Sequence, residues 1–346
     1  MEPSGVSGSP VQFAALPQDD VLPFDDTQAI RVDFNVLEYI GTRRDLMITP
    51  VMKRIYQGLQ QRNDSPFTVL LHGASGVGKT MTLLFVGHMA RKSECLVFPI
   101  QANEFVDQER SLSVIVARFL RSWRDAVGDR LLRQIPCQIS RFSNLLDLLT
   151  DTWSSPSNVI ANFGMLVDEL QILSAVPVVF LIDQCNAFYT KHTVQIFPDD
   201  ERKVVEPGSG HNPIASLFVQ WNTFRLKRGC ILYAVSSSSF HSMPPASDGK
   251  WNLCETLQPM GSAEFRKLVQ VSVNSRHVPQ DVLQPQIFPQ LFDLCAGIPR
   301  ELLAFTLAWR SSHEPNFDLA KLVYLNNRRK FYYHRMKRLF DKETMG

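Results

Sequence analysis

The segment Gly73–Thr80 reads GASGVGKT and fits the pattern G-x-x-x-x-G-K-[ST] without a mismatch. Glycines let the backbone curl so that successive N–H groups point inward, where they can cradle phosphate oxygens. A lysine at the end of such a turn can neutralise the β and γ phosphates of a nucleotide, and the hydroxyl that follows can bind Mg²⁺. The pattern predicts a nucleoside triphosphate site, with ATP expected rather than GTP, formed by Gly73, Ala74, Ser75, Gly76, Val77, Gly78, Lys79 and Thr80.

Such a site also needs a carboxylate at the end of a neighbouring strand, because this group holds the water shell of the metal. The apolar run VVFLID ends in Asp183, which we expect beside Thr80 at the metal; a turn aspartate after a core strand is the alternative. Many ATPases have glutamate at the next position, but this chain has Gln184. An amide can orient water but cannot accept its proton. We therefore expect slow or absent hydrolysis, with Lys79, Asp183 and Gln184 at the catalytic positions.

Two further features could sense the γ-phosphate. The apolar run GCILYAV is followed by the four serines Ser236–Ser239. The segment CAGIPRELL places Arg300 at the start of a helix, where Pro299 suits the first helical turn. From there Arg300 can reach the phosphates and report nucleotide state to the C-terminal helices. The alternative interpretations are a serine-rich turn and a solvated arginine.

The composition is that of a globular chain, with 346 residues, 45% hydrophobic and 20% charged. The formal net charge is only +2, so any nucleic acid or membrane partner must meet a local patch. No stretch approaches the about 18 consecutive apolar residues that span a bilayer, so we predict no membrane helix. The first 26 residues contain no Lys or Arg, unlike a secretory or mitochondrial leader, which favours a cytoplasmic or nuclear location.

Strand-like and helical segments alternate along the chain, which predicts a three-layer α/β fold with a parallel central sheet. Short apolar runs predict strands at Val69–His72, Leu96–Ile100, Val176–Ile182 and Gly229–Val235. Apolar residues at helical spacing predict helices at Arg43–Gln61, Met81–Ala90, Ser111–Arg133, Leu145–Trp153, Asn158–Leu173 and Pro213–Phe224. The polar segment Asp199–Gly210 is typical of an exposed loop.

We divide the chain into three parts. Residues 1–35 form a predicted flexible lead, because Met1–Asp26 is rich in Pro, Ser, Gly and Asp. Residues 36–256 form the predicted nucleotide-binding core. Residues 257–346 form a predicted helical subdomain with helices at Ser262–Val271, Gln286–Cys295, Pro299–Ser311 and Phe317–Leu339.

Six segments together resemble the P-loop NTPase module of Crinkler and retrotransposon-hot-spot proteins. They are Gly73–Thr80, FLIDQCNAF, ILYAVSSSSF, LQPMGSAEFRKL, GIPRELL and FYYHRMKRL, and the resemblance extends over about residues 36–340. It implies an AAA or STAND-like ATPase core. In that family the core is often joined to a C-terminal nuclease domain and, in secreted oomycete effectors, to an N-terminal translocation header, neither of which we recognise in this sequence.

The chain is also similar to the death-associated GTP-binding protein of the mitochondrial small ribosomal subunit. The segments that carry this similarity are GKTMTLLFVGHMARKSECLVFPI, IDQCNAFY and NPIASLFVQWNTFRLKRGCILYAVSSSS. The resemblance implies a mitochondrial, nucleotide-binding structural subunit. In it Lys79 and Thr80 would bind phosphate and metal, and Asp183 would be the second carboxylate.

The segment Arg328–Lys342 contains seven basic residues and one acidic residue, a net charge of +6, with Phe331, Tyr332 and Tyr333 among them. Such a basic, aromatic helix could lie on the phosphates of nucleic acid, including ribosomal RNA. The alternative is a solvated helix face whose aromatic side chains pack on the body. No protein partner is indicated. We expect a Mg-dependent nucleotide switch with slow hydrolysis; a nucleotide-binding structural subunit and a nucleic-acid-acting effector are the alternatives.

Overall fold

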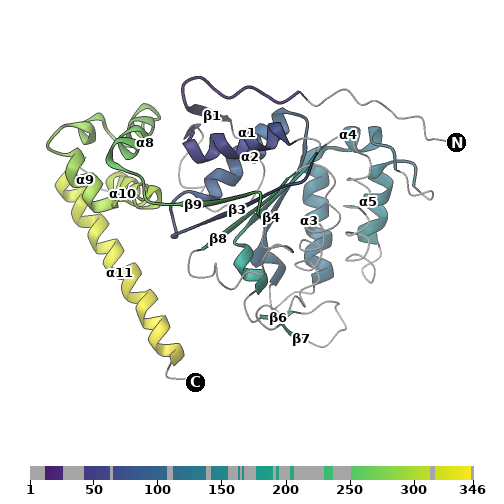
Figure 1. Cartoon of the computed structure of the whole chain (residues 1–346). Coiled ribbons are helices and arrows are strands. Elements are labelled where there is room, and N and C mark those ends of the chain that lie inside the picture. Colours follow the sequence, from purple (N-terminus) through teal and green to yellow (C-terminus); the bar gives the residue numbers. More distant parts are fainter. Residues whose placement is uncertain are drawn as a thin grey trace.

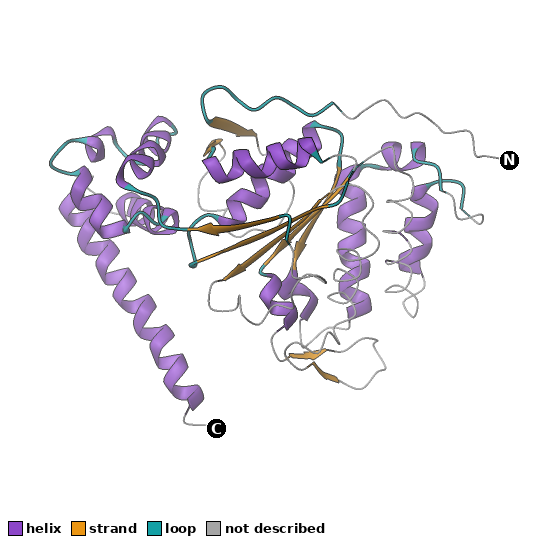
Figure 2. Cartoon of the chain, in the orientation of Figure 1, coloured by secondary structure: helices purple, strands orange, loops and turns teal. Residues whose placement is uncertain are grey.

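Five parallel strands form the centre of the structure, in the order β4-β5-β8-β3-β9. They are β3 (Phe67–Gly73), β4 (Leu96–Gln101), β5 (Val178–Asp183), β8 (Cys230–Ser236) and β9 (Leu253–Leu257). The structure is a computed structural model that describes residues 12–25, 43–62, 65–106, 112–137, 142–154, 163, 166, 177–189, 192–194, 203–205, 230–236, 251–311 and 316–343. The parallel sheet with helices on both sides confirms the predicted three-layer α/β fold (Figure 2).

Helices cover both faces of the sheet (Figure 1). One face packs on α1 (Pro50–Gln61) and α2 (Lys79–Lys92), and the other on α3 (Leu112–Val127), α4 (Asp129–Gln134) and α5 (Leu145–Ser154). Successive residues of a strand point to opposite faces. Val69 and Leu71 therefore join the core beneath α1 and α2, whereas Leu70 joins the core beneath α3. Burial on both faces explains why the central strands β5 and β8 are continuous apolar runs.

The C-terminal helices form a separate core. They are α8 (Ser262–Asn274), α9 (Phe288–Cys295), α10 (Pro299–Ser311) and α11 (Phe317–Glu343), with the short 3-10 turn η6 (Gln280–Leu283) between the first two. Phe265, Leu291 and Phe305 are fully buried in this core. The end of α11 projects away from it (Figure 1). The four predicted C-terminal helices are therefore confirmed, with small shifts at their ends.

The prediction of one helix over Arg43–Gln61 was wrong in its first part. Residues Arg43–Met47 form strand β2, and α1 begins only at Pro50. The reason is local: proline is tolerated in the first helical turn, and the Thr49 side chain accepts a hydrogen bond from the Met52 backbone N–H at 3.3 Å. Strand β2 pairs antiparallel with β1 (Val21–Asp25). Part of the predicted flexible lead is therefore a strand, with Leu22 buried.

Four other predictions need correction or fall outside the described residues. The helix predicted over Ser111–Arg133 is broken at Gly128, whose φ of +89° suits glycine, so α3 and α4 are separate. The loop predicted over Asp199–Gly210 contains β7 (Lys203–Val205), which pairs with β6 (His192–Val194). Strand β9 was not predicted. The helices predicted at Asn158–Leu173 and Pro213–Phe224 lie outside the described residues, apart from residues 163 and 166.

Within the described residues, none of the helices combines the length and the apolar character that crossing a bilayer requires.

Candidate nucleotide-binding site

The glycine turn joins β3 to α2 at the carboxyl edge of the sheet, where ligands of open parallel sheets bind. Gly73, Gly76 and Gly78 have φ values of +150°, +91° and +108°, a region that favours glycine. A Cβ atom on Gly73 would lie 2.3 Å from the Leu257 carbonyl oxygen, and one on Gly76 would lie 2.7 Å from Cβ of Arg300. The turn therefore needs glycine at both positions, and it places the positive end of the 14-residue α2 toward any bound anion.

Lys79 folds over this turn. Its Nζ atom donates to the carbonyl oxygens of Gly73 at 2.8 Å and Ala74 at 2.7 Å. Burial lowers the pKa of Lys79; the Asp183 carboxylate partly opposes this effect, and the Arg300 guanidinium adds to it. A phosphate beside Lys79 would favour its charged form in the same way as a carboxylate does. Lys79 is thus positioned at the glycine turn, where its ammonium group could bind an anion.

Asp183 ends β5 and is buried. Its Oδ2 atom accepts a hydrogen bond from the Thr80 hydroxyl at 2.7 Å, and its Oδ1 atom accepts one from the Gln184 backbone N–H at 2.9 Å. Burial raises the pKa of Asp183. The hydrogen bond from Thr80 opposes this rise more than the hydrogen bond from the Gln184 backbone does. The chain has a P-loop NTPase fold. The Thr80 hydroxyl and the Asp183 carboxylate meet although they lie on different elements, as the sequence predicts.

The Thr80–Asp183 pair also fits a magnesium ion. Mg²⁺ prefers oxygen ligands and is usually bound by one or two protein groups together with substrate phosphates and water. Thr80 and Asp183 supply a hydroxyl and a carboxylate in contact, next to the turn that would hold the phosphates. No cluster of three His, Cys, Asp or Glu side chains that could hold a metal alone is found in the described part of the chain. A magnesium ion here would therefore need the nucleotide as well.

Gln184 follows β5 directly and lines the same cavity as Lys79. Its φ of +52° is uncommon for a residue other than glycine, and it starts the turn into η3 (Cys185–Tyr189). A backbone in this region costs of order 1 kcal/mol and persists where its surroundings hold it. The structure thus places the predicted water-orienting amide at the rim of the site, next to Asp183.

Arg300 contacts the glycine turn from the C-terminal helices. Its Nη1 atom donates to the Ser75 hydroxyl at 2.6 Å, and its backbone N–H donates to the Gly76 carbonyl oxygen at 3.3 Å. The first turn of α10 therefore contacts the glycine turn, and whether Arg300 reaches a bound phosphate stays a prediction. Ser236 is the last residue of β8 and pairs with Gly73 in the sheet, while Ser237–Ser239 lie outside the described residues.

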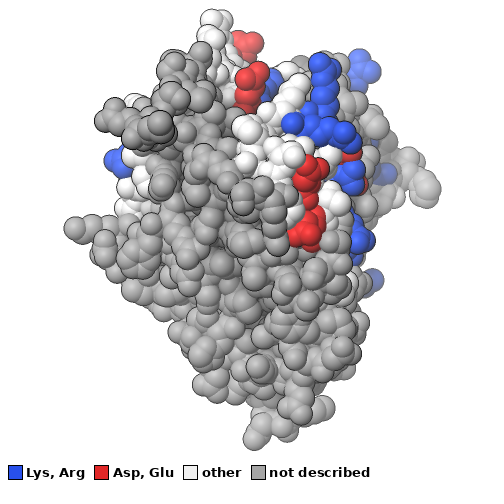
Figure 3. Space-filling view, turned by 90° about the vertical axis from the view of Figure 1, so that its right-hand side faces the viewer, with Lys and Arg blue, Asp and Glu red and all other residues white. Residues whose placement is uncertain are grey.

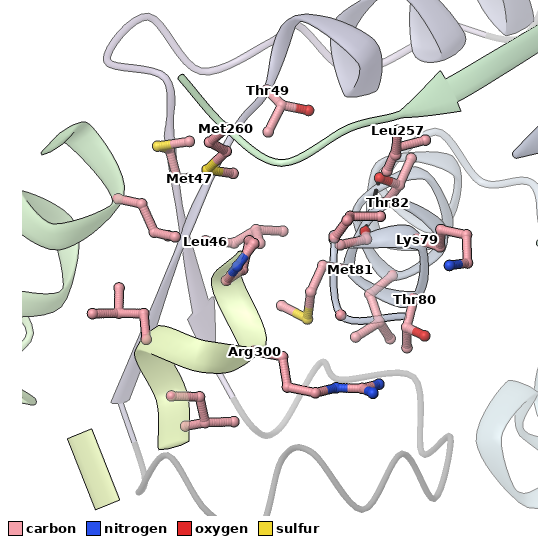
Figure 4. Close-up of a pocket in the computed structure, with 18 of the residues that line it drawn as sticks. Leu46, Met47, Thr49, Lys79, Thr80, Met81, Thr82, Leu257, Met260 and Arg300 are labelled. Atoms are coloured by element: carbon pink, nitrogen blue, oxygen red, sulfur yellow. Dashed lines mark hydrogen bonds between the residues drawn. The ribbon is translucent and has the colours of Figure 1, made fainter. Parts of the chain in front are cut away.

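A cavity of about 580 Å³ extends from the glycine turn into the space between the sheet and the C-terminal helices. Figure 4 shows Lys79, Thr80 and Arg300 on one side of it and Leu46, Met47 and Met260 on the other. The sequence did not predict this second group, because Leu46, Met47 and Met260 lie far from the glycine turn along the chain. Residues of the cavity wall that were not predicted include Asp45, Leu46, Met47, Thr49, Met52, Met81, Asn186, Met260, Leu268, Val271, Ser272, Ser275, His277, Leu303, Thr306 and Arg310.

No protein-family model and no curated protein matches the sequence. Among solved structures, the chain is similar to the ORC2 protein of Aeropyrum pernix in its ADP form, with 14% identity and a TM-score of 0.47 over 79% of this chain and 66% of that chain. A point variant of RuvB from Thermotoga maritima gives 10% identity and a TM-score of 0.42, also over 79% and 66%. RuvB of that organism, described as a Holliday junction branch migration motor, gives 12% and 0.39 over 79% and 67%. The chain thus spans about two thirds of these structures.

Proposed function

We propose that the protein binds a Mg-nucleoside triphosphate at Gly73–Thr80 and works as a nucleotide-gated switch with slow hydrolysis. The observation that supports this most directly is the contact between the Thr80 hydroxyl and the Asp183 carboxylate at 2.7 Å, next to Lys79. Magnesium, when bound, supplies positive charge to the β and γ phosphates. In the proposal Thr80 and Asp183 hold the ion, and Lys79 exchanges its two carbonyl acceptors for phosphate oxygens.

Arg300 supports the switch part of the proposal. In the structure its guanidinium donates to Ser75, a residue of the turn that would surround the phosphates. A phosphate is a better partner for the guanidinium than a serine hydroxyl, because it is charged and can accept two parallel hydrogen bonds from an arginine. Transfer of Arg300 from Ser75 to the phosphate would shift the first turn of α10. The C-terminal helices would thereby respond to the nucleotide.

Gln184 supports slow turnover. Gln184 and Asn186 are the cavity-lining residues that directly follow Asp183, and both carry amides, which orient water but do not accept its proton. Asp183 itself is engaged by Thr80 and by the Gln184 backbone. These residues therefore favour long-lived nucleotide binding over rapid hydrolysis.

The end of α11 supports a second partner, nucleic acid. The helix is anchored at Glu301, whose Oε2 atom accepts from the Tyr324 hydroxyl at 2.8 Å and lies 2.6 Å from Nε of Arg328. Beyond that anchor, Tyr332 and Tyr333 are 51% and 65% exposed, so at least half of each side chain faces solvent. Exposed aromatic rings among cations suit stacking on bases and contact with phosphates. We propose that Arg328–Lys342 binds nucleic acid.

The charge on another face of the described residues differs from that of this segment. In the view of Figure 3, basic and acidic side chains of described residues lie side by side. Arg124 of α3 is paired with Asp129 of α4 at 2.6 Å. The segment Arg328–Lys342, in contrast, has almost entirely one sign. We propose that the chain is an NTPase module like that of Crinkler proteins. The alternative is a structural subunit of the mitochondrial small ribosomal subunit, in which ribosomal RNA would be the nucleic acid.

Titration with fluorescent nucleotide triphosphates, with and without Mg²⁺, tests the proposed function. We expect wild-type binding to weaken when Mg²⁺ is removed, and Asp183→Asn to weaken binding only when Mg²⁺ is present. Asp147→Asn, an exposed change on α5 outside the cavity, is the matched control. Binding that is indifferent to both Mg²⁺ and Asp183→Asn would contradict the proposed metal site. Mass spectrometry of the nucleotide and partners retained on purification separates the two settings.

A further inference from the structure

The cavity continues well beyond the part that would hold the phosphates. Its wall includes one face of α10, from Arg300 at the glycine turn through Leu303 and Thr306 to Arg310. Ten residues of α-helix rise about 15 Å. The cavity is therefore long enough to hold a nucleotide lengthwise, with the phosphates at Lys79 and the base toward the other end.

The middle of the cavity has apolar walls. Leu46 and Met47 line it from β2, and Met260 lines it from the segment before α8 (Figure 4). Methionine sulfur atoms make favourable contacts with aromatic rings, and apolar walls with a few placed polar groups are typical of small-molecule sites. This part of the cavity suits a nucleobase held by its faces, so the polar groups beside it would select which base binds.

Asp45 is the carboxylate that β2 contributes to this cavity. Its position in β2 is fixed by pairing with Pro23 of β1. Its Oδ2 atom accepts a hydrogen bond from the Ser275 hydroxyl, at the end of α8, at 3.1 Å. A carboxylate has about four acceptor sites on its two oxygens, so this bond leaves capacity for further donors. Asp45 can therefore accept hydrogen bonds from a ligand while it remains attached to α8.

We infer that Asp45 reads the base and that the base is guanine. This inference rests on the proposed nucleotide site and names its substrate class. Guanine presents two donors side by side, N1–H and the N2 amino group, and one carboxylate can accept from both. Adenine presents the N6 amino donor next to N1, an acceptor whose lone pair would face the carboxylate. The donor chemistry thus selects guanine in place of the ATP expected from the sequence, and β2, which the sequence did not predict, supplies the residue.

The effect of Asp45→Asn differs according to whether Asp45 is purely structural or reads the base. If the Asp45–Ser275 bond only fastens α8 to β2, then Asp45→Asn and Ser275→Ala should weaken all nucleotides by similar factors. If Asp45 reads the base, Asp45→Asn should change the order of preference. An asparagine can accept from N1–H of xanthine and donate to its C2 carbonyl, whereas its amide N–H groups meet the N2 amino donors of guanine.

The experiment is equilibrium binding of Mg-GTP, Mg-ITP, Mg-XTP and Mg-ATP to the full chain. We expect wild type to prefer GTP over ATP by roughly 10- to 100-fold, the discrimination that a good bidentate pair gives, with ITP between them because it lacks the N2 amino group. Asp45→Asn should reverse the order of GTP and XTP. Ser275→Ala and the exposed Asp293→Asn should keep the wild-type order.

The possible results separate this inference from the proposed function. Equal affinity of wild type for GTP and ATP overturns the inference, and so does an unchanged order in Asp45→Asn. In both cases the proposed nucleotide site still stands if wild type binds nucleotide and Lys79→Ala does not. If wild type binds none of the four nucleotides, the proposed function fails as well.

Discussion

The Thr80 hydroxyl donates a hydrogen bond to the Asp183 carboxylate across 2.7 Å, although 103 residues separate them in the chain. The contact forms because α2 begins, and β5 ends, at the carboxyl edge of the sheet. It keeps a buried carboxylate partnered and places together the two side chains that would hold the metal. If this pair holds the metal as proposed, its two side chains are already in contact and binding does not need to bring them together.

Thr80→Val should destabilise the nucleotide-free protein, because it leaves the Asp183 carboxylate without its hydroxyl donor. An unsatisfied buried polar group costs about 1–3 kcal/mol, and we expect the free energy of unfolding to fall by that amount. Urea denaturation without nucleotide measures it. Thr80→Ser keeps the donor and is the control. A Thr80→Val protein as stable as Thr80→Ser would show that the hydrogen bond contributes nothing.

Gly73→Ala should destabilise the fold more than Gly78→Ala. Both glycines have positive φ values, so both changes carry the cost of a left-handed backbone, about 1–2 kcal/mol. Only the new Cβ at Gly73 would meet backbone, at 2.3 Å from the Leu257 carbonyl oxygen, whereas the one at Gly78 meets nothing within 4 Å. Overpacking adds about 1–3 kcal/mol for Gly73→Ala alone. Thermal unfolding compares the two, and equal losses would contradict the close approach of β9.

The parts of the site that depend on local sequence could be predicted, and those that depend on distant pairing could not. The glycine turn could be predicted because contiguous residues form its pattern. Asp183 could be predicted because it directly follows an apolar run. Strand β9 beside β3 and strand β2 beside β1 are pairings between distant segments, and their residues alternate or are short of apolar character. Asp45 and Met260 reach the cavity only through those pairings, so no pattern in the sequence pointed to them.

Gln184→Glu should raise the rate of nucleotide hydrolysis, because a carboxylate can accept a proton from the attacking water and an amide cannot. We expect an increase of roughly 10- to 100-fold, at the low end of what general bases contribute. Phosphate release under single-turnover conditions measures it. Asn186→Asp adds a carboxylate two residues away in the same cavity wall and should have little effect. A rapid wild-type rate, or a fall in Gln184→Glu, would mean that another group positions the water.

Charge reversal at Arg335 and Arg338 should weaken binding to nucleic acid while nucleotide binding stays normal. The two residues are three apart in α11, so they lie on one face of the helix. If both contact phosphates, the slope of log K against log salt should flatten by about 1.5 to 2. Fluorescence anisotropy with labelled RNA and labelled duplex DNA at increasing salt measures this slope.

The control for the segment Arg328–Lys342 is charge reversal at both Arg118 and Arg121, which are three apart and exposed on α3. This control should leave affinity and salt dependence unchanged. Loss of binding in both double variants would indicate a general charge effect rather than a binding segment. If wild type binds neither RNA nor DNA at low salt, the nucleic-acid proposal is wrong and the segment is a solvated helix face.

Calorimetric titration of Mg-nucleotide into wild type and Lys79→Ala tests the central claim most directly. Lys79 carries the positive charge that the glycine turn holds, so we predict that its truncation removes detectable binding and leaves the thermal unfolding transition in place. Lys92→Ala, an exposed change at the other end of α2, should bind as wild type does. Unchanged affinity in Lys79→Ala would contradict the claim that this turn holds the phosphates of a nucleotide.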